Sequence, residues 1–201
     1  MSRRWLTEKG GDFYHRMAKE QGYRSRATYK LKQLDDRFQI FRGALFVLDV
    51  GAAPGGWLQL ASESIQNGGL ILGVDLEEIE DLGLENVKTI VGDILDEGTF
   101  ERIKRFFPGK IDVILSDLAP NVSGVWDMDH YRQIDLAKMA LDIAKRILRR
   151  KGWFVSKVFQ GSEYEAYLSD VKEAFSLVRI VKPKASRKGS AETYVVAKYM
   201  K

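Results

Sequence analysis

Four apolar segments that each lead into an aspartate constrain the fold of this chain more than any other feature. They are LFVLDV (45–50), GLILGVD (69–75), VKTIVGD (87–93) and KIDVILSD (110–117). The first of them, LFVLDV, is a short, continuous apolar run, which is typical of a strand covered on both faces, as in parallel sheets. Such sheets bind ligands beyond the carboxyl ends of their strands. The acids in these segments therefore predict a site along one edge of the sheet: Asp49, Asp75, Asp93 and Asp117.

Helical and strand patterns alternate along the rest of the chain. Helices are expected at 56–66, 130–150 and 163–175, and a fifth strand at 152–159. Strands at 177–183 and 192–199 leave no room for a helix between them, so they predict an antiparallel pair. The expected fold is α/β, with a mostly parallel seven-stranded sheet, an antiparallel C-terminal hairpin and helices on both faces.

The length of the chain, 201 residues, predicts a single domain with one core. Charge is distributed unevenly along it. Residues 1–42 hold 11 Lys and Arg against 5 Asp and Glu. Basic helices are expected at 12–20 and 26–41, so these residues should form a helical extension that packs on the domain. Residues 179–201 hold 7 against 1, whereas residues 43–178 hold 14 against 22. Two basic ends that meet on one face would bind a polyanion such as RNA.

The chain has no cysteine and two histidines, His15 and His130. This composition excludes disulfides, thiolate ligands and a cysteine nucleophile, and it predicts that no metal is bound. It also fits a reducing compartment, so we expect a cytoplasmic protein. No segment approaches the roughly 18 apolar residues of a membrane span, and the start, MSRRWLTEKG, is unlike a secretory signal. We expect a monomer that does not bind membranes.

The stretch LDVGAAPGG (48–56) narrows the class of ligand. A P-loop ends in Gly-Lys-Ser/Thr, and this stretch has no lysine. A dinucleotide site needs G-x-G-x-x-G, whereas the glycines here are Gly51, Gly55 and Gly56. Asp49 would also lie unfavourably beside two phosphates, but an acid at this position suits a cationic ligand.

S-adenosylmethionine (SAM) meets these requirements, because it carries an ammonium and a sulfonium and no phosphate. Asp75 follows the glycine loop by about 20 residues, the spacing at which an acid accepts ribose hydroxyls in dinucleotide sites. Asp93, in VGDI, is expected to accept the adenine amino group.

The residues also indicate which group would be methylated. Carbon-5 methylation of pyrimidines needs a cysteine, and methylation of an exocyclic amine usually uses an Asn/Asp-Pro-Pro-aromatic loop that SDLAPN (116–121) lacks. A hydroxyl instead needs a base that takes its proton. Lys157 lies inside the apolar segment FVSKVFQG (154–161), where burial would favour the neutral amine. Further candidates are Lys30, in the basic N-terminal helix, and Glu192, the one acid among the last 23 residues.

The sequence resembles the FtsJ/RrmJ family of ribosomal RNA 2′-O-ribose methyltransferases. The matching stretches are GYRSRATYKL, LDVGAAPGGW, SDLAPNVSG, SKVFQG and SAETYVVA. The resemblance implies a Rossmann-like, SAM-dependent methyltransferase fold. It implies methylation of the 2′-hydroxyl of a uridine ribose in 23S ribosomal RNA, within the large ribosomal subunit, with S-adenosyl-L-homocysteine as the product.

The resemblance also implies the roles of individual residues. Lys157 would be the base, Asp117 would lie between cofactor and lysines, and Lys30 and Glu192 would position the ribose. The implied cofactor site consists of Gly51, Pro54, Gly55, Gly56, Trp57, Asp75, Asp93 and Asp117. RNA contacts are expected from the basic ends, at Arg24, Arg26, Lys32, Lys182, Lys184, Arg187 and Lys188.

Other interpretations stay open. The lysines could mainly orient the hydroxyl, while proximity of the reactants, worth up to roughly 7–11 kcal/mol, supplies most of the rate. The ribose could belong to tRNA or to an mRNA cap. The chain could also be a non-catalytic RNA-binding assembly factor on the same scaffold, which a complete catalytic set argues against, or a nicotinamide oxidoreductase, which the missing second glycine disfavours. Trp126 could stack on a base or anchor its loop on the core.

Overall fold

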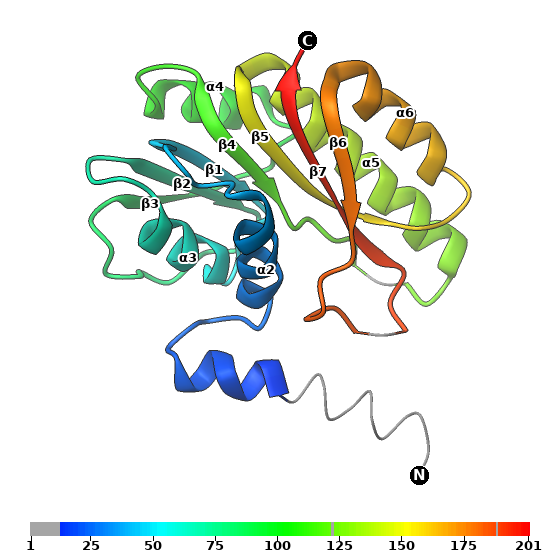
Figure 1. Ribbon diagram of the computed structural model, residues 1–201, viewed down its shortest axis with the longest axis horizontal. Coiled ribbons are helices and arrows are strands. Elements are labelled where there is room, and N and C mark those ends of the chain that lie inside the picture. Colours follow the sequence, from blue (N-terminus) through cyan, green and yellow to red (C-terminus); the bar gives the residue numbers. More distant parts are fainter. Residues whose placement is uncertain (1–12, 122, 188) are drawn as a thin grey trace.

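The structure is a computed structural model that describes residues 13–121, 123–187 and 189–201. In this part of the chain, seven strands form one sheet in the order β3-β2-β1-β4-β5-β7-β6 (Figure 1). Strands β1 to β5 are parallel, and β7 is antiparallel to both of its neighbours. The strands are β1 (Phe46–Val50), β2 (Leu70–Asp75), β3 (Val87–Val91), β4 (Ile111–Ser116), β5 (Leu148–Phe159), β6 (Phe175–Val181) and β7 (Glu192–Met200).

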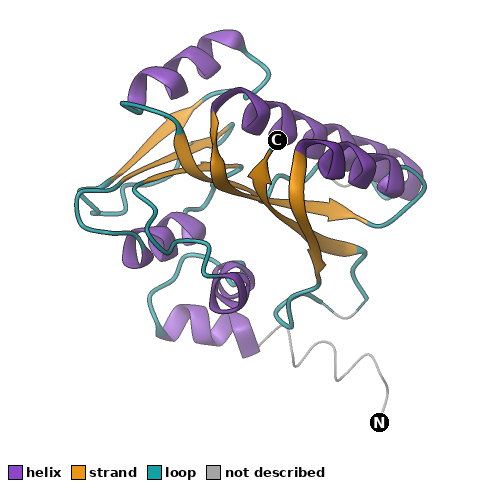
Figure 2. Ribbon diagram, turned by 45° about the horizontal axis from the view of Figure 1, so that its top comes forward, coloured by secondary structure: helices purple, strands orange, loops and turns teal. Residues whose placement is uncertain are grey.

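Helices cover both faces of the sheet (Figure 2). One face packs against a cluster that includes Leu34 and Leu58, and the other against a cluster that includes Phe100 and Leu141. The α/β fold expected from the sequence is therefore confirmed. The helices are α2 (Thr28–Phe38) and α3 (Gly56–Ser64) on the first face, and α4 (Glu97–Phe106), α5 (Trp126–Ile147) and α6 (Tyr164–Ala174) on the second.

The last strand lies inside the sheet rather than at its edge. β7 pairs with β5 on one side and with β6 on the other, so the predicted antiparallel pair of β6 and β7 is confirmed. Because β7 runs antiparallel to β5, its first residue, Glu192, lies opposite Phe159 at the carboxyl end of β5. In the same register Tyr194 lies opposite Lys157. The antiparallel direction of β7 thus brings its first residues to the edge where the parallel strands end.

Two elements differ from the expectations. Helix α5 begins at Trp126 and ends at Ile147, and Leu148 has an extended backbone that begins β5. Leu148 is buried in the strand as it would be in the helix, so the apolar pattern of the sequence did not reveal where the helix ends. Helix α4 had no predicted counterpart. It begins after Asp96, whose carboxylate accepts a hydrogen bond from Thr99 N at 2.9 Å.

The N-terminal extension packs on the sheet domain. Residues 13–20 are helical, and α2 follows them. Leu31 and Leu34 of α2 are buried in the same cluster as α3. Tyr29 of α2 joins a smaller cluster with Ala18 and Ala185, which connects the extension to the segment before β7. The first 12 residues of the expected extension lie outside the described residues.

Candidate active site

The four predicted acids lie along one edge of the sheet. Asp49 lies in β1, Asp75 ends β2, Asp117 follows β4 directly, and Asp93 lies two residues beyond β3. These strands are parallel and adjacent, so their carboxyl ends meet at the same edge.

The loop after β1 turns at two glycines. Gly51 has a φ of +77° and Gly55 a φ of +106°, values that favour glycine. A Cβ atom at Gly51 would lie 2.8 Å from Leu118 Cδ2, so the loop and the segment after β4 approach closely only because this residue is glycine. The backbone amides of Gly51 and Ala52 donate to Val74 O at 2.9 and 3.3 Å, which holds the loop against β2.

Asp75 and Asp93 each accept hydrogen bonds from backbone amides at this edge. Asp75 Oδ2 accepts a hydrogen bond from Ala53 N at 2.8 Å, and Asp75 Oδ1 accepts one from Glu77 N at 3.0 Å. Asp93 Oδ1 accepts a hydrogen bond from Leu95 N at 2.9 Å. A carboxylate has about four lone-pair sites, so both acids can accept further hydrogen bonds from a ligand.

Asp49 is a buried acid whose carboxyl oxygens find no hydrogen-bond partner among the described residues. Its exposed fraction is 1%. Burial, followed by the charges of Asp117 and Asp75, raises the pKa of Asp49 well above its usual value. Burying an acid without a partner is unfavourable for the fold. Such a group fits a site where a ligand supplies the missing partner.

Gly56 and Trp57, at the start of α3, contact the N-terminal extension. A Cβ atom at Gly56 would lie 2.5 Å from Thr28 Oγ1, so α2 could not approach α3 this closely with another residue there. Trp57 Nε1 donates to Ala27 O at 2.8 Å, and the Trp57 ring lies 5.9 Å from that of Tyr194. These contacts hold α2, which carries Lys30, in place beside the sheet edge.

Arg24 joins the loops that follow β1 and β2. Its Nη1 donates to Pro54 O at 3.3 Å and to Glu80 O at 2.6 Å, and its Nη2 donates to Asp81 O at 2.7 Å. The backbone amide of Arg24 donates to Gln59 Oε1 at 2.9 Å. The sequence predicted an RNA contact here. The structure places this guanidinium against backbone carbonyls of the predicted cofactor loops.

Two ion pairs meet at the carboxyl ends of β4 and β5. Lys157 Nζ lies 3.2 Å from Asp117 Oδ1 and donates to Asp117 O at 2.6 Å. Lys30 Nζ lies 2.8 Å from Glu192 Oε2. The Tyr194 hydroxyl donates to Asp117 Oδ1 at 2.7 Å and accepts from Lys30 Nζ at 3.4 Å. The predicted set of two lysines and two acids therefore forms one connected group through a tyrosine.

Tyr194 was not among the residues predicted from the sequence. It is fully buried, and burial, followed by the charges of Asp117 and Glu192, raises its pKa well above the usual value. The hydroxyl therefore keeps its proton and donates a hydrogen bond to Asp117. Tyr194 follows Glu192 by two residues in β7, and residues two apart in a strand lie on the same face. That spacing was the signal that could have identified it.

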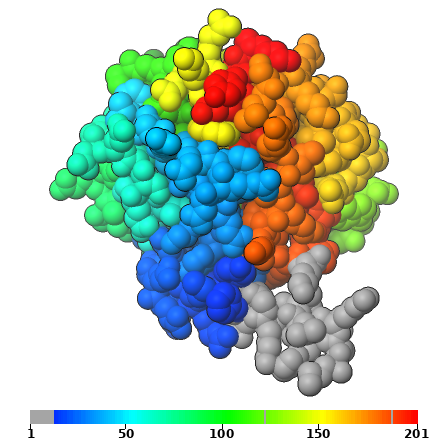
Figure 3. Space-filling model, in the orientation of Figure 1, coloured from blue at the N-terminus to red at the C-terminus, as the bar shows by residue number. Residues whose placement is uncertain are grey.

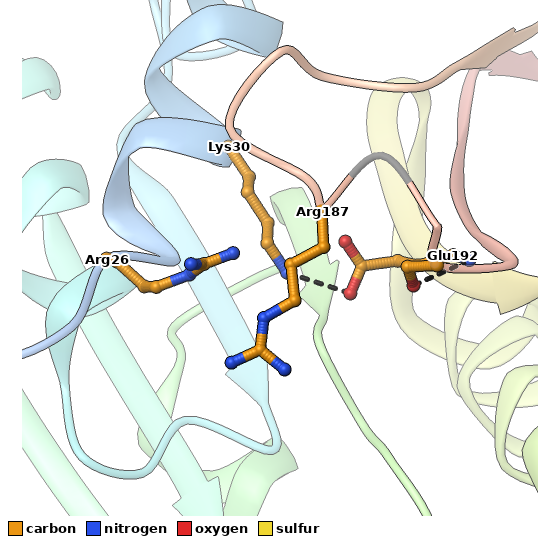
Figure 4. A pocket seen from close by; sticks show the side chains of 5 residues that line it. Arg26, Lys30, Arg187 and Glu192 are labelled. Atoms are coloured by element: carbon orange, nitrogen blue, oxygen red, sulfur yellow. Dashed lines mark hydrogen bonds and ion pairs between the residues drawn. The ribbon is translucent and has the colours of Figure 1, made fainter. Parts of the chain in front are cut away.

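A pocket of about 230 Å³ opens beside this group. Figure 4 shows the guanidinium groups of Arg26 and Arg187 near the ion pair of Lys30 and Glu192. Burial lowers the pKa of Arg26, and the charge of Arg187 lowers it further. A bound anion would relieve the repulsion between the two cations. The pocket is lined by Arg26, Lys30, Arg187, Ser190 and Glu192.

The described N-terminal residues from 13 onward (blue) lie beside the segment that leads into β7 (orange; Figure 3), and residues of both segments line the pocket. Arg26 Nη2 donates to Ala185 O at 3.3 Å, and Ala185 N donates to Gln33 Oε1 at 3.3 Å. Parts of both basic ends therefore meet beside the pocket, whereas Lys198 and Lys201 lie toward the other end of β7.

The remaining predicted RNA contacts differ in their surroundings. Lys182 Nζ donates to Ser190 O, Lys184 is exposed, Lys32 is half-buried, and Lys188 lies outside the described residues. Within the described ranges, no group of three or more His, Cys, Asp or Glu side chains is arranged to hold a metal ion. None of the helices in those ranges is long and apolar enough to cross a membrane.

Comparison with known proteins identifies the family. The model of the FtsJ-like methyltransferases matches residues 23–200. The chain belongs to the FtsJ-like methyltransferase family. A relative from Methanothrix thermoacetophila, named Ribosomal RNA large subunit methyltransferase E, is 55% identical over 187 residues, which cover 93% of this chain and 72% of that protein. A relative of the same name from Methanothermobacter thermautotrophicus is 43% identical over 201 residues, covering 100% of this chain and 95% of that protein.

Solved structures agree with this assignment. The crystal structure of a ribosomal RNA methyltransferase from Plasmodium falciparum matches with a TM-score of 0.78 and 28% sequence identity. The match covers 89% of this chain and 98% of that one. The resemblance to the FtsJ/RrmJ family that the sequence motifs suggested is therefore confirmed, and this FtsJ-like chain is a methyltransferase.

Proposed function

We propose that this FtsJ-like protein is a SAM-dependent methyltransferase that modifies the 2′-hydroxyl of a uridine ribose in large-subunit ribosomal RNA. The observation that carries the proposal is the connected group of two lysines, two acids and a tyrosine at the carboxyl edge of the sheet. Family membership supports methyl transfer, and the names of the relatives support the RNA substrate. The absence of cysteine supports action in the cytoplasm, and we propose a monomer.

The residues at the ends of β1, β2 and β3 fit SAM. When bound, SAM supplies a methyl group on a positively charged sulfur, and S-adenosyl-L-homocysteine is the product. The buried carboxyl of Asp49 fits a cationic ligand group, because it finds no partner among the described residues. The turn at Gly51 lets the backbone approach the ligand closely. Asp75 and Asp93 retain acceptor capacity for the ribose hydroxyls and the adenine amino group.

Lys157 is the proposed base. In its neutral form, its Nζ accepts the proton that the 2′-hydroxyl releases during methyl transfer. The carbonyl and carboxylate of Asp117, at 2.6 and 3.2 Å, hold this nitrogen in a fixed place. Lys30 can donate to the target ribose and Glu192 can accept from it, and their 2.8 Å ion pair fixes both. Alignment of the hydroxyl by these groups contributes proximity as well as proton transfer.

Arg26 and Arg187 are the proposed contacts to an RNA phosphate beside the target ribose. Both line the pocket that also exposes Lys30 and Glu192. A guanidinium group matches a phosphate through two parallel hydrogen bonds, and this geometry is lost when lysine replaces arginine. The other basic residues proposed to contact RNA would add attraction that weakens with salt, and they are Lys32, Lys182, Lys184 and Lys188.

Transfer of labelled methyl groups from SAM tests the proposed function. Large ribosomal subunits, free ribosomal RNA and bulk tRNA would be offered in parallel, and the labelled nucleotide would be digested to separate ribose from base methylation. We expect ribose label on large-subunit RNA. Label confined to tRNA would overturn the substrate but keep the chemistry, and label on a base would overturn the chemistry. SAM binding without transfer to any of these RNAs would favour a non-catalytic assembly factor.

Substitution of Tyr194 by phenylalanine is expected to lower kcat about tenfold, because one hydrogen bond to a charged group is lost. The ring remains packed 5.9 Å from Trp57, so the melting temperature should change little. Asp117 and Lys30 lose the hydroxyl that joins them. Kinetics with ribosomal RNA and a thermal melt measure both effects. An unchanged kcat would show that the two ion pairs act independently.

Substitution of Arg24 by alanine is expected to weaken SAM binding about tenfold, because the loops after β1 and β2 lose a shared donor. SAM affinity is measured by calorimetry, and RNA affinity by filter binding without SAM. Arg179→Ala is the matched control, since the Arg179 guanidinium donates to the carbonyl of its neighbour Val178. If RNA affinity falls while SAM affinity is unchanged, Arg24 is an RNA contact after all.

A further inference from the structure

A cluster of apolar side chains is exposed at the start of α5, on the edge of the sheet that carries the proposed active site. Val125 is 55% exposed, Trp126 49%, Met128 43% and Tyr131 51%. The sequence left two roles open for Trp126, base stacking or anchoring its loop on the core. With about half of its surface in solvent, the Trp126 side chain is not a buried anchor.

The ring of Trp126 is nevertheless held in a defined orientation. It lies 6.0 Å from the ring of His130 at an interplanar angle of 19°, and 6.1 Å from the ring of Phe159 at 17°. His130 is itself fixed, because its Nε2 accepts a hydrogen bond from Glu163 N at 3.1 Å. A Cβ atom at Gly161 would lie 2.6 Å from the His130 ring, so the backbone packs directly on that ring. The Trp126 ring is thus nearly parallel to both neighbouring rings, and we call these three rings the platform.

Ser123 and Gly124, which lead into the platform, are also held by contacts to a side chain of α5. Asp129 Oδ1 accepts hydrogen bonds from Ser123 N at 2.8 Å and Ser123 Oγ at 2.7 Å, and Asp129 Oδ2 accepts one from Gly124 N at 3.2 Å. These contacts tie the loop after β4 to the first turn of α5. Trp126 therefore needs little ordering when a ligand binds, which favours affinity.

The platform is continuous with the proposed active site. Phe159 follows Lys157 by two residues in β5, so the two lie on the same face of the strand. Phe159 also lies opposite Glu192 in the pairing of β5 with β7. A target ribose held by Lys157 and Glu192 would therefore have its neighbouring nucleotide within reach of the rings.

We propose that Trp126 stacks on a nucleobase of the substrate RNA adjacent to the target nucleotide. This inference rests on the proposed function. Every base has a π-face that stacks on an aromatic ring, and single-stranded RNA is recognised in this way. A folded protein is a poorer fit, because four half-exposed side chains offer roughly 400 Å², half of the about 800 Å² per partner of a stable interface. The platform thus selects a target ribose in an unstacked strand.

A double-mutant cycle between protein and RNA tests the proposal. The substrate is an RNA fragment that the wild-type protein methylates on ribose, together with versions that lack the base immediately 5′ or 3′ of the target. We expect Trp126→Ala to raise the KM for the intact fragment about tenfold, with kcat and SAM affinity unchanged. Removal of one flanking base should raise the wild-type KM by a similar factor and leave the KM of the variant unchanged.

Two control variants separate stacking from other effects. Trp126→Phe keeps an aromatic face and should retain most of the affinity, whereas Ile180→Ala removes an exposed apolar side chain on β6 and should change nothing. If Trp126→Ala has the same KM as the wild type, the stacking proposal is overturned. The proposed function is tested separately, because it stands as long as the wild type methylates ribose. Base removal that affects wild type and Trp126→Ala equally would overturn it too. A defect seen only with assembled subunits would show that a ribosomal protein contacts the platform.

Discussion

Replacing Lys157 by methionine is expected to reduce kcat for ribose methylation by about 10²–10⁴-fold, the usual contribution of a positioned general base. Methionine is unbranched and apolar, so it suits a position that is 6% exposed. Asp117 keeps the hydrogen bond from Tyr194 in this variant. SAM affinity should therefore stay within a few-fold of wild type. Single-turnover methyl transfer and calorimetry measure the two quantities.

A second substitution at the same position separates proton transfer from positioning. Arginine keeps the positive charge and remains protonated, so Lys157→Arg can hold Asp117 but cannot act as a base. We expect it to be as inactive as Lys157→Met. Substantial activity in Lys157→Arg would show that Lys157 orients the hydroxyl and that proximity supplies the rate. Lys198→Met, at a half-buried lysine of β7, is the control and should retain activity.

Replacing Asp49 by asparagine is expected to change ligand-free stability and SAM binding in opposite directions. The pKa of Asp49 is raised in the folded state, so the folded protein loses stability as pH rises from the usual value of 3.8 through the raised pKa. Asparagine has no such ionisation. The ligand-free variant should therefore melt at a higher temperature at neutral pH, by about 2–4 °C for each kcal/mol relieved. The difference in melting temperature between Asp49→Asn and wild type should become smaller as pH falls toward 3.8.

The same variant is expected to bind SAM about tenfold more weakly or worse, because a charged partner for the ligand is lost. Thermal melts across pH and calorimetric titration with SAM measure the two effects. Asp112→Asn is the matched control. Asp112 is also a buried acid, but its Oδ2 accepts from Leu45 N and Phe46 N at 2.7 and 2.8 Å, and its Oδ1 pairs with Arg149 at 2.7 Å. This control should lose stability and keep its SAM affinity. Equal SAM binding by Asp49→Asn and wild type would contradict the role of Asp49.

The local sequence pattern was sufficient to predict much of the fold, because most helices and strands are determined by residues that are close in sequence. Strands β1 to β4 were predictable since each is a short, mostly apolar segment that contains or is followed closely by an acid. Helix α4 was missed because few of its residues are apolar, although Asp96 and the spacing of Phe100, Ile103 and Phe107 mark it. The end of α5 was misplaced because Leu148 is buried as the first residue of β5.

For the site, the residue types that the proposed chemistry needs could be predicted from the sequence, but their contacts could not. The glycine loop and the acids at the strand ends indicated a cationic, SAM-like ligand before any geometry was known. The basic N-terminal segment did not reveal that Arg24 donates hydrogen bonds to backbone carbonyls. These belong to Pro54, Glu80 and Asp81, residues that are 30 to 57 positions away.

The sequence by itself determined the class of fold, the family, and the identities of the groups that the proposed chemistry needs. These follow from the order of apolar and charged residues along the chain. Only the tertiary structure decided that β7 lies between β5 and β6, because long-range strand order depends on packing of the whole sheet. That placement brings Glu192 and Tyr194 to Lys157 and joins two ion pairs that are separate in sequence. The tertiary structure also places the ring of Trp126 against that of Phe159, with about half of the Trp126 side chain exposed to solvent.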